Sequence, residues 1–436
     1  MKPKICYLNS HDGITGAGIG GYRTFKGLSN FCDDIDIEML VRYKSSKNPR
    51  VKKIKKLFWW PLVYLKFKLL VLFQKSRFNT FRTYNKSLHS ICNLNYISHK
   101  YLNNSKYDII TFHWLGNLIL SIEEIGKIKK PIVWKLADQW AFSGGEHYTS
   151  FLDINGKTNI CERYKNGYLD NNRPLGELGK DINKLTWQRK YNSWKKQINI
   201  ICPSKWLAKC AKESILMKDW PIHVIPNSID RNIWYPKEKK YARKELSLPS
   251  ENPIIFFNSS LGMKDKRKGG DLLLKTLEIL KATSTNQSLK KLELIILGQK
   301  SMIENHNFKI PIHVFNYTNN IKLIRLLYAA SDVVAIPSRQ DNLPNVGQEA
   351  FACGRPVVAF NYSGLVDIVD HQVNGCLAKP FDPYSLAKSI EWLYEDDQRL
   401  DNLGKNALLK AKSEWDPNMI SKKYQDIYLD IFNKSE

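Results

Sequence analysis

Two carboxylates in residues 337–364 are placed to hold a polar ligand. Asp341 lies in the loop after the apolar run 333–336, and Glu349 stands eight positions later, on a predicted helix. A carboxylate accepts two hydrogen bonds, so Glu349 is suited to the vicinal hydroxyls of a ribose and Asp341 to those of a second sugar ring. These two side chains therefore predict a site for a sugar-bearing ligand.

The turn between the two carboxylates predicts a place for an anion. It consists of Asn342, Leu343, Pro344 and Asn345, at the start of the predicted helix. A helix amino terminus presents N–H groups and the positive end of the helix dipole. The amides of Leu343 and Asn345 can therefore hold a phosphate or a sugar hydroxyl.

A cluster of basic residues follows the apolar run 254–258. The stretch 264–274 reads KDKRKGGDLLL and includes Arg267 and Lys268. A fixed ammonium stabilises the negative charge that grows on a leaving phosphate, without a metal ion. No Asp-x-Asp pair ends a predicted strand, so we expect no metal requirement. We also expect no bound cofactor. On its own, this stretch is more typical of a solvated lysine run.

The first half carries two further candidate groups. Gly16, Gly18 and Gly21 form a Gly-x-Gly-x-x-Gly pattern between a predicted strand and a predicted helix, formally a dinucleotide-binding fingerprint. His113 ends the apolar run 108–112, which places its ring at the carboxyl edge of a sheet. A lone histidine is more often a structural residue, so its position at a strand end is what favours a functional role.

Short apolar, β-rich runs alternate with helix-like stretches from end to end, which predicts an α/β fold with parallel sheets. The predicted strands of the first half are 5–8, 37–41, 108–112, 132–136, 198–202 and 223–225. Those of the second half are 254–258, 292–297, 312–315, 333–336 and 357–360. A turn-rich stretch at 225–230 separates the two sets. The pattern therefore predicts two doubly wound domains with a hinge near residue 228.

The segment that contains both carboxylates resembles a motif of the retaining glycosyltransferases of family 4, which have the GT-B fold. That family carries Glu-x7-Glu followed by a Gly-Pro-Val-Val strand. Here Asp341 stands at the first Glu, Glu349 matches the second, and 353–359 reads CGRPVVA. The resemblance implies two Rossmann-like domains that face each other across a cleft, 1–228 on the acceptor side and 229–415 for the nucleotide sugar. It also implies that a helix at 416–436 packs back on the first domain.

The resemblance also implies roles for the candidate residues. Glu349 would bind the ribose and Asp341 the transferred sugar of a UDP- or GDP-sugar, beside the turn 342–345. Lys268 and Arg267 would bind the diphosphate. When the domains close, Gly16 and Gly18 would lie near the phosphate, and His113 would contact the transferred sugar. Transfer would retain the anomeric configuration, by front-face displacement.

One loop of the first half is similar to a subgroup of bacterial surface-polysaccharide transferases. Residues 135–148 read KLADQWAFSGGEHY, in which Asp138, Trp140 and His147 match that subgroup, while Ala137 replaces a usual His. The resemblance places acceptor or sugar contacts at these three residues.

The net charge of +25 is concentrated in one part of the chain. Between Glu38 and Asp108 there are 16 Lys and Arg and no acidic residue. Within this stretch, 57–73 reads LFWWPLVYLKFKLLVLF, which predicts either an interfacial helix on anionic lipid at 52–77 or a helix pair packed on its own domain. The first interpretation suggests a peripheral protein at the inner face of the cell membrane and a polyprenyl-diphosphate-linked glycan acceptor, as in O-antigen, capsule or exopolysaccharide assembly.

Other functions remain open on the residues alone. Charge favours a nucleic-acid-binding protein, but the basic excess lies in one hydrophobic segment and no known nucleic-acid module is present, so we expect no nucleic-acid partner. The glycines alone would suit a nicotinamide-dependent dehydrogenase. The fold would suit a sugar phosphorylase, a sucrose-type synthase, or a transferase with a soluble or protein acceptor. Eight irregularly spaced cysteines and the absence of a secretory signal indicate a cytoplasmic protein.

Overall fold

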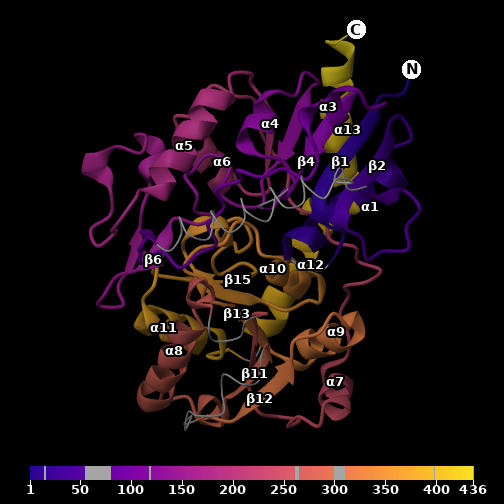
Figure 1. Cartoon of the computed structure of the whole chain (residues 1–436). Helices are drawn as coiled ribbons and strands as arrows, with labels where there is room; N and C mark the ends of the chain where they lie inside the picture. The colour runs from indigo at the N-terminus through magenta and orange to yellow at the C-terminus, as the bar shows by residue number, and fades with distance from the viewer. Residues whose placement is uncertain are drawn as a thin grey trace. The chain divides into compact units, whose positions relative to one another are not determined.

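The computed structural model describes residues 1–13, 16–54, 80–116, 119–260, 265–298, 310–396 and 398–435. The chain divides into two compact units: unit 1 comprises Met1–Ser228 and Pro417–Glu436, and unit 2 comprises Ile229–Asp416. Each unit is built on one parallel sheet, and Figure 1 labels several strands of each. The predicted α/β class with two Rossmann-like sheets is therefore confirmed.

Unit 1 has a seven-stranded sheet in the order β3-β2-β1-β4-β5-β8-β9, and each neighbouring pair is parallel. Its strands are β1 (Lys4–His11), β2 (Asp36–Tyr43), β3 (Val51–Lys53), β4 (Ile109–Phe112), β5 (Ile132–Lys135), β8 (Asn199–Cys202) and β9 (Ile222–Val224). A separate antiparallel pair is formed by β6 (Ser150–Leu152) and β7 (Thr158–Ile160).

Helices bury both faces of this sheet, which explains why its strands are continuously apolar. Successive side chains of β1 point to opposite faces, so Ile5 and Tyr7 belong to one buried cluster and Cys6 and Leu8 to another. The first cluster is completed by α1 (Gly16–Phe31) and α13 (Pro417–Asn433). The helices on the other side are α3 (His99–Asn103), α4 (Ile122–Gly126), α5 (Ile182–Ser193) and α6 (Lys205–Glu213).

Unit 2 has a six-stranded parallel sheet in the order β12-β11-β10-β13-β14-β15. Its strands are β10 (Ile254–Asn258), β11 (Glu293–Gly298), β12 (Ile312–Asn316), β13 (Val333–Ile336), β14 (Val357–Phe360) and β15 (Gly375–Ala378). One face packs on α8 (Gly270–Thr283) and α11 (Pro383–Leu393). The other packs on α7 (Lys239–Glu245), α9 (Ile321–Ala330), α10 (Asn345–Ala352) and α12 (Arg399–Glu414).

Both sheets reverse their strand order at one point, which is where parallel α/β sheets bind ligands. In unit 1 the chain builds outward from β1 through β2 and β3, then continues with β4 on the other side of β1. In unit 2 the reversal lies between β10 and β13. The carboxyl ends of β1, β4, β10 and β13 are therefore the places to look for functional side chains.

The hydrophobic basic segment expected at 52–77 lies, from residue 55 on, outside the described residues. Among the residues that are described, no helix has the length and apolar character that crossing a membrane requires.

Tyr428 tests how much α13 contributes to unit 1. Its ring is fully buried in the cluster that contains Ile5 and Phe25, and its hydroxyl accepts a hydrogen bond from Thr111 Oγ1 at 3.0 Å. Tyr428→Ala should lower the free energy of unfolding of unit 1 by about 3–5 kcal/mol, because it leaves a cavity. Urea denaturation followed by circular dichroism measures the change.

Tyr384→Ala is the matched control, because Tyr384 on α11 is 62% exposed. It should change the free energy of unfolding by less than about 0.5 kcal/mol. Equal effects of the two substitutions would show that α13 does not stabilise unit 1.

Candidate functional site

Asp341 is the centre of a hydrogen-bonded cluster between the carboxyl ends of β10 and β13. Its Oδ2 accepts hydrogen bonds from Lys268 Nζ at 2.7 Å and from Ser338 Oγ at 2.9 Å. Its Oδ1 accepts from Arg267 Nη1 at 3.1 Å. Lys268 and Arg267 precede Asp341 by 73 and 74 positions in the sequence. The structure thus brings these three residues together at the reversal of strand order in unit 2.

The charges around Asp341 keep it ionised. Burial on its own raises the pKa of Asp341, but the positive charges of Lys268 and Arg267 and the hydrogen bonds from Lys268 and Ser338 outweigh that effect. The pKa of Asp341 therefore lies below its ordinary value, and the side chain is a carboxylate at neutral pH.

The whole cluster has an excess of positive charge. Ion pairs join Asp265, Asp271 and Asp341 to Lys266, Arg267, Lys268 and Arg339. Counted over these described residues, four cations meet three carboxylates, an excess of one positive charge. An anionic ligand such as a diphosphate is suited to this edge of the sheet.

Backbone contacts position the lysine turn against the loop of Asp341. Gly269 has φ +71°, and a Cβ there would lie 1.8 Å from the Pro337 carbonyl oxygen, so only glycine fits. Arg339 N–H donates to the Arg267 carbonyl at 2.7 Å, and its guanidinium forms two hydrogen bonds of 2.8 Å to the Asp271 carboxylate. The turn of Lys268 and Gly269 is therefore in close contact with the loop that follows β13.

The turn after β14 supports Asp341 from its other side. Asp341 N–H donates to Ser363 Oγ at 3.1 Å, and Gly364 N–H donates to the Asp341 carbonyl at 2.9 Å. A Cβ at Gly364 would lie 1.2 Å from the Asn342 carbonyl oxygen, so this position too requires glycine. Asp341 is thus fixed by turns that follow three neighbouring strands.

Glu349 lies in the second turn of α10, which begins at Asn345 directly after Pro344. The Glu349 side chain is 7% exposed, and its Oε2 accepts a hydrogen bond of 3.0 Å from the Tyr328 hydroxyl on α9. Pro344 makes no side-chain cap for the helix. The predicted turn 342–345 and Glu349 therefore share the start of one helix, beside Asp341.

His113 lies at the carboxyl end of β4, next to β1. Its Nε2 is 2.9 Å from the Ala17 carbonyl oxygen, and its Nδ1 is 3.3 Å from the Lys135 carbonyl oxygen. Burial, helped by the charge of Lys135, lowers the pKa of His113 to about 3. The ring is therefore neutral, and we assign its single N–H to Nε2, where the acceptor is nearer.

The glycine pattern lies in a helix and not in a loop, which corrects our prediction. Gly16 and Gly18 form the first turn of α1, and Gly21 follows on the same helix. A Cβ at Gly21 would lie 2.5 Å from Asn9 Nδ2 and 2.6 Å from His113 Cδ2. The pattern therefore includes a glycine that lets the helix pack closely on the ends of β1 and β4.

Asp138, Trp140 and His147 form one buried group with Ser90. His147 Nδ1 is 2.6 Å from Asp138 Oδ2, and His147 Nε2 is 2.7 Å from Ser90 Oγ. Trp140 stacks on the His147 ring, with a centroid distance of 6.2 Å, and donates its indole N–H to the Ser90 carbonyl at 2.7 Å. Ser90 was missed in the sequence because it lies 57 residues from His147.

These predicted residues surround one small pocket. His113, Asp138, Trp140 and His147 line a cavity of about 20 Å³, which has room for a single water-sized group. The structure therefore brings together all four first-half side chains for which the sequence suggested sugar or acceptor contacts.

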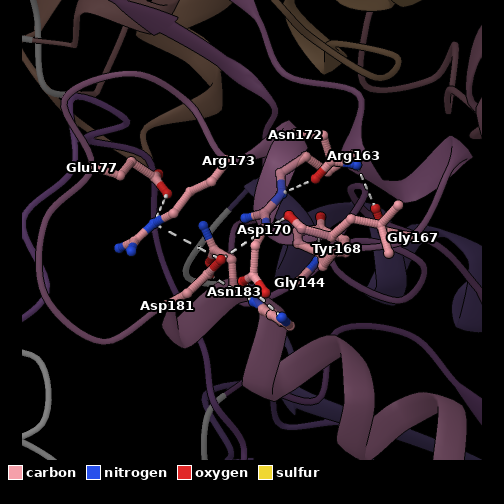
Figure 2. A network of polar contacts seen from close by, with 12 residues as sticks. Gly144, Arg163, Gly167, Tyr168, Asp170, Asn172, Arg173, Glu177, Asp181 and Asn183 are labelled. Atoms are coloured by element: carbon pink, nitrogen blue, oxygen red, sulfur yellow. Dashed lines mark hydrogen bonds and ion pairs between the residues drawn. The ribbon is translucent and has the colours of Figure 1, made fainter.

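A polar network holds the loop that carries Asp138 and His147 (Figure 2). The Tyr168 hydroxyl accepts from Gly144 N–H at 2.7 Å and donates to Glu146. Asn183 Oδ1 accepts from Gly145 N–H at 3.2 Å, and Arg163 bonds to Asn172, Leu169 and Asp181. The double glycine of this loop thus exposes backbone N–H groups to side chains.

Two buried lysines complete the support of unit 1, and neither was predicted. Lys190 Nζ donates to the carbonyl oxygens of Trp140, Ser143 and Gly144, and burial lowers its pKa to about 7. Lys135 Nζ donates to Thr24 Oγ1 at 2.6 Å, and burial also lowers its pKa to about 7. Lysine is rarely buried, so no sequence pattern pointed to either residue.

The described residues contain no group of three or more His, Cys, Asp or Glu arranged to hold a metal ion.

Comparison with known proteins relates the second unit to a family. Residues 238–410 match the family described as glycosyl transferases group 1. A D-inositol 3-phosphate glycosyltransferase of Xylanimonas cellulosilytica is 30% identical over 212 residues, which are 45% of this chain and 48% of that protein. The D-inositol 3-phosphate glycosyltransferase of Segniliparus rotundus is 29% identical over 202 residues, which are 44% of this chain and 43% of that protein. The chain thus spans about half the length of the curated relatives it matches.

Solved structures resemble the chain over nearly its whole length. Sucrose-phosphate synthase from Thermosynechococcus elongatus has a TM-score of 0.66 at 16% identity, with 99% of this chain and 100% of that chain covered. HepE from Anabaena, solved with UDP and glucose, has a TM-score of 0.62 at 16% identity, with 98% and 100% covered. WaaG, a glycosyltransferase involved in lipopolysaccharide biosynthesis, has a TM-score of 0.59 at 13% identity, with 97% and 99% covered. Residues 238–410 are therefore a domain of the glycosyl transferases group 1 family, within a chain that has the GT-B fold.

Proposed function

We propose that this protein is a retaining glycosyltransferase that takes a sugar from a UDP- or GDP-sugar. The observation that carries the proposal is the contact of Lys268 and Arg267 with Asp341 at the strand-order reversal of unit 2. This cluster lies inside the matched family region and has one positive charge in excess. HepE, a structural neighbour, was solved with UDP-glucose, which supports a nucleotide-sugar donor.

In this proposal each part of the cluster binds one part of the donor. Lys268 and Arg267 hold the diphosphate, and the amides at the start of α10 hold a phosphate oxygen or a sugar hydroxyl. Glu349 binds the ribose hydroxyls with the carboxylate that Tyr328 orients. Fixed cations stabilise the charge on the departing nucleotide, so we propose transfer without a metal ion.

Asp341 and the diphosphate would compete for the same cations. When the diphosphate draws Lys268 and Arg267 to itself, the Asp341 carboxylate loses two hydrogen bonds and can accept hydrogen bonds from the sugar hydroxyls. Asp341 would then recognise the sugar most strongly when the diphosphate is in place. The acceptor hydroxyl attacks the anomeric carbon on the face that the nucleotide leaves, and the configuration is retained.

We propose that unit 1 provides the acceptor side. His113, Asp138, Trp140 and His147 already share one pocket, and its aromatic and hydrogen-bonding walls suit a sugar hydroxyl. The acceptor is proposed to be a polyprenyl-diphosphate-linked glycan in surface-polysaccharide assembly, at the inner face of the cell membrane. The basic segment 52–77 and the lipopolysaccharide role of WaaG support this assignment.

Glu349→Gln tests the ribose contact. The amide oxygen can still accept from Tyr328, but the charge-assisted hydrogen bonds to the ribose are weakened by about 1.5–3 kcal/mol. The affinity for UDP or GDP, measured by titration calorimetry, should therefore fall roughly 10- to 100-fold. Glu278→Gln, an exposed position on α8, is the control and should leave affinity unchanged. Unaltered nucleotide affinity in Glu349→Gln would contradict this role.

Asp341→Asn tests the competition for the cations. Lys268 and Arg267 lose their buried counter-charge, so UDP or GDP should bind about 2- to 10-fold more tightly, while sugar transfer is lost. Titration calorimetry and a transfer assay on the same preparation measure the two effects. A parallel loss of nucleotide affinity and transfer, with an unchanged unfolding temperature, would show that Asp341 does not compete with the diphosphate.

Charge reversal tests the membrane segment. Lys66→Glu combined with Lys68→Glu should reduce binding to vesicles that contain anionic lipid by at least about tenfold, since each lysine contributes about 1 kcal/mol near such a surface. Vesicle sedimentation measures the bound fraction. Lys388→Glu with Lys405→Glu makes the same charge change at exposed positions of unit 2. Unchanged binding of the first variant, or equal losses in both, would end the membrane proposal.

A further inference from the structure

Unit 1 contains a second cavity, at the edge of its sheet opposite to the sites described above. It has a volume of about 260 Å³ and opens at the amino-terminal ends of β5 and β8, next to the end of α13. Small-ligand pockets begin at about 300 Å³, so this cavity has room for part of a small molecule. β5 and β8 have four residues each, and a strand of that length spans roughly 13 Å. The cavity is therefore separated by about the length of a strand from the pocket of His113 and His147.

The interior of this cavity is apolar. Its apolar lining consists of Ile125, Ile128, Ile132, Trp194, Ile198 and Ile431. Each of these side chains is at most 8% exposed and belongs to the buried clusters of unit 1. The walls are therefore set by the core of the unit, and they suit a hydrocarbon chain.

Lysines surround the mouth of the cavity. Lys130, Lys196 and Lys434 line it, and none of the described lining residues is acidic, although Lys434 is paired with Asp430 at 2.7 Å. Lys130 belongs to the turn before β5 and Lys196 to the turn before β8, and Lys196 Nζ donates to the Lys129 carbonyl at 3.0 Å. The helices that precede the two turns end in close contact, since a Cβ at Gly126 would lie only 2.2 Å from the Ser193 carbonyl oxygen. The fold thus joins two basic turns that are far apart in the sequence.

Two of these lysines bind neutral oxygens. Lys130 Nζ donates to the Ser105 carbonyl at 2.6 Å and to the Tyr107 carbonyl, and Lys196 donates to a carbonyl as well. Within the part of the chain that is described, neither ammonium forms an ion pair with a carboxylate. Burial lowers the pKa of Lys130, which shows that its charge is partly desolvated. The charge of Asp108 acts on the pKa of Lys130 in the opposite direction, but the hydrogen bonds of both ammonium groups go to neutral oxygens, so an anion at the cavity mouth is favourable.

We propose that this cavity binds a single-chain phosphate amphiphile, with the hydrocarbon chain inside and the phosphate at Lys130 and Lys196. The apolar lining and the lysine mouth each match one half of such a molecule. Neither a free phosphate nor a nonionic detergent satisfies both halves. The site is separate from the proposed donor and acceptor sites, so it does not depend on sugar transfer.

Titration calorimetry of the full chain with three probes tests this assignment. Dodecyl phosphate, below its micelle concentration, should bind at least tenfold more tightly than inorganic phosphate and than dodecyl maltoside. Ser435→Trp, at the exposed end of the cavity lining, should block the cavity and reduce dodecyl phosphate binding at least tenfold. Similar affinities for all three probes would overturn the proposal.

A pair of neighbouring charge reversals separates this site from general electrostatic attraction. Lys196→Glu should weaken dodecyl phosphate binding at least tenfold, whereas Lys195→Glu, outside the lining, should change it less than twofold. Equal losses in both variants would mean that net charge alone attracts the probe. UDP affinity, measured on the same variants, should be unchanged, so a failure here is distinguishable from a failure of the proposed donor site.

Discussion

The candidate donor site depends on one interaction: the buried carboxylate of Asp341 shared between Lys268 and Arg267. A carboxylate inside a protein is costly unless it is paired and hydrogen-bonded. Here the cost is offset because turns from three neighbouring strands deliver the partners, and two glycines let those turns touch. The same contacts that stabilise Asp341 therefore assemble the cations and the helix start at one edge of the sheet. Local stability and ligand chemistry have a common cause in unit 2.

At the carboxyl edge of its sheet, unit 1 positions its candidate side chains in a different way. Asp138 is the one carboxylate among its functional candidates. The buried lysines of this unit bind neutral oxygens: Lys190 donates to backbone carbonyls and Lys135 to the Thr24 hydroxyl. Lys190 fixes the loop of Asp138 and His147, and Lys135 fixes α1 beside His113. A pocket of aromatic and hydrogen-bonding side chains suits hydroxyl groups, whereas the cationic edge of unit 2 suits a diphosphate. The two sheets share a topology but differ in the charge of the side chains at their ligand edges.

Much of the fold was predictable because the strands are buried on both faces and read as apolar runs. All eleven predicted strands are present, several with identical bounds, such as β10, β13 and β14. The four missed strands carry weaker signals: β3, β6 and β7 have only three residues each, and β15 begins with a glycine. Asp341 and Lys268 could be found from motif spacing, but Ser90, Lys135 and Lys190 could not. Their positions follow from tertiary contacts between distant segments, which no local pattern encodes.

The return of the chain to unit 1 through α13 has a consequence for biosynthesis. A ribosome releases the residues of unit 2 before it releases Tyr424 and Tyr428, which complete the cluster around Tyr7 and Phe25. While unit 2 is being translated, the first 228 residues therefore lack α13, and the apolar side chains that α13 covers stay exposed. During that time, chaperones and proteases can bind this apolar surface of the nascent chain. A chain truncated shortly before residue 417 would lack α13 and would keep the surface exposed.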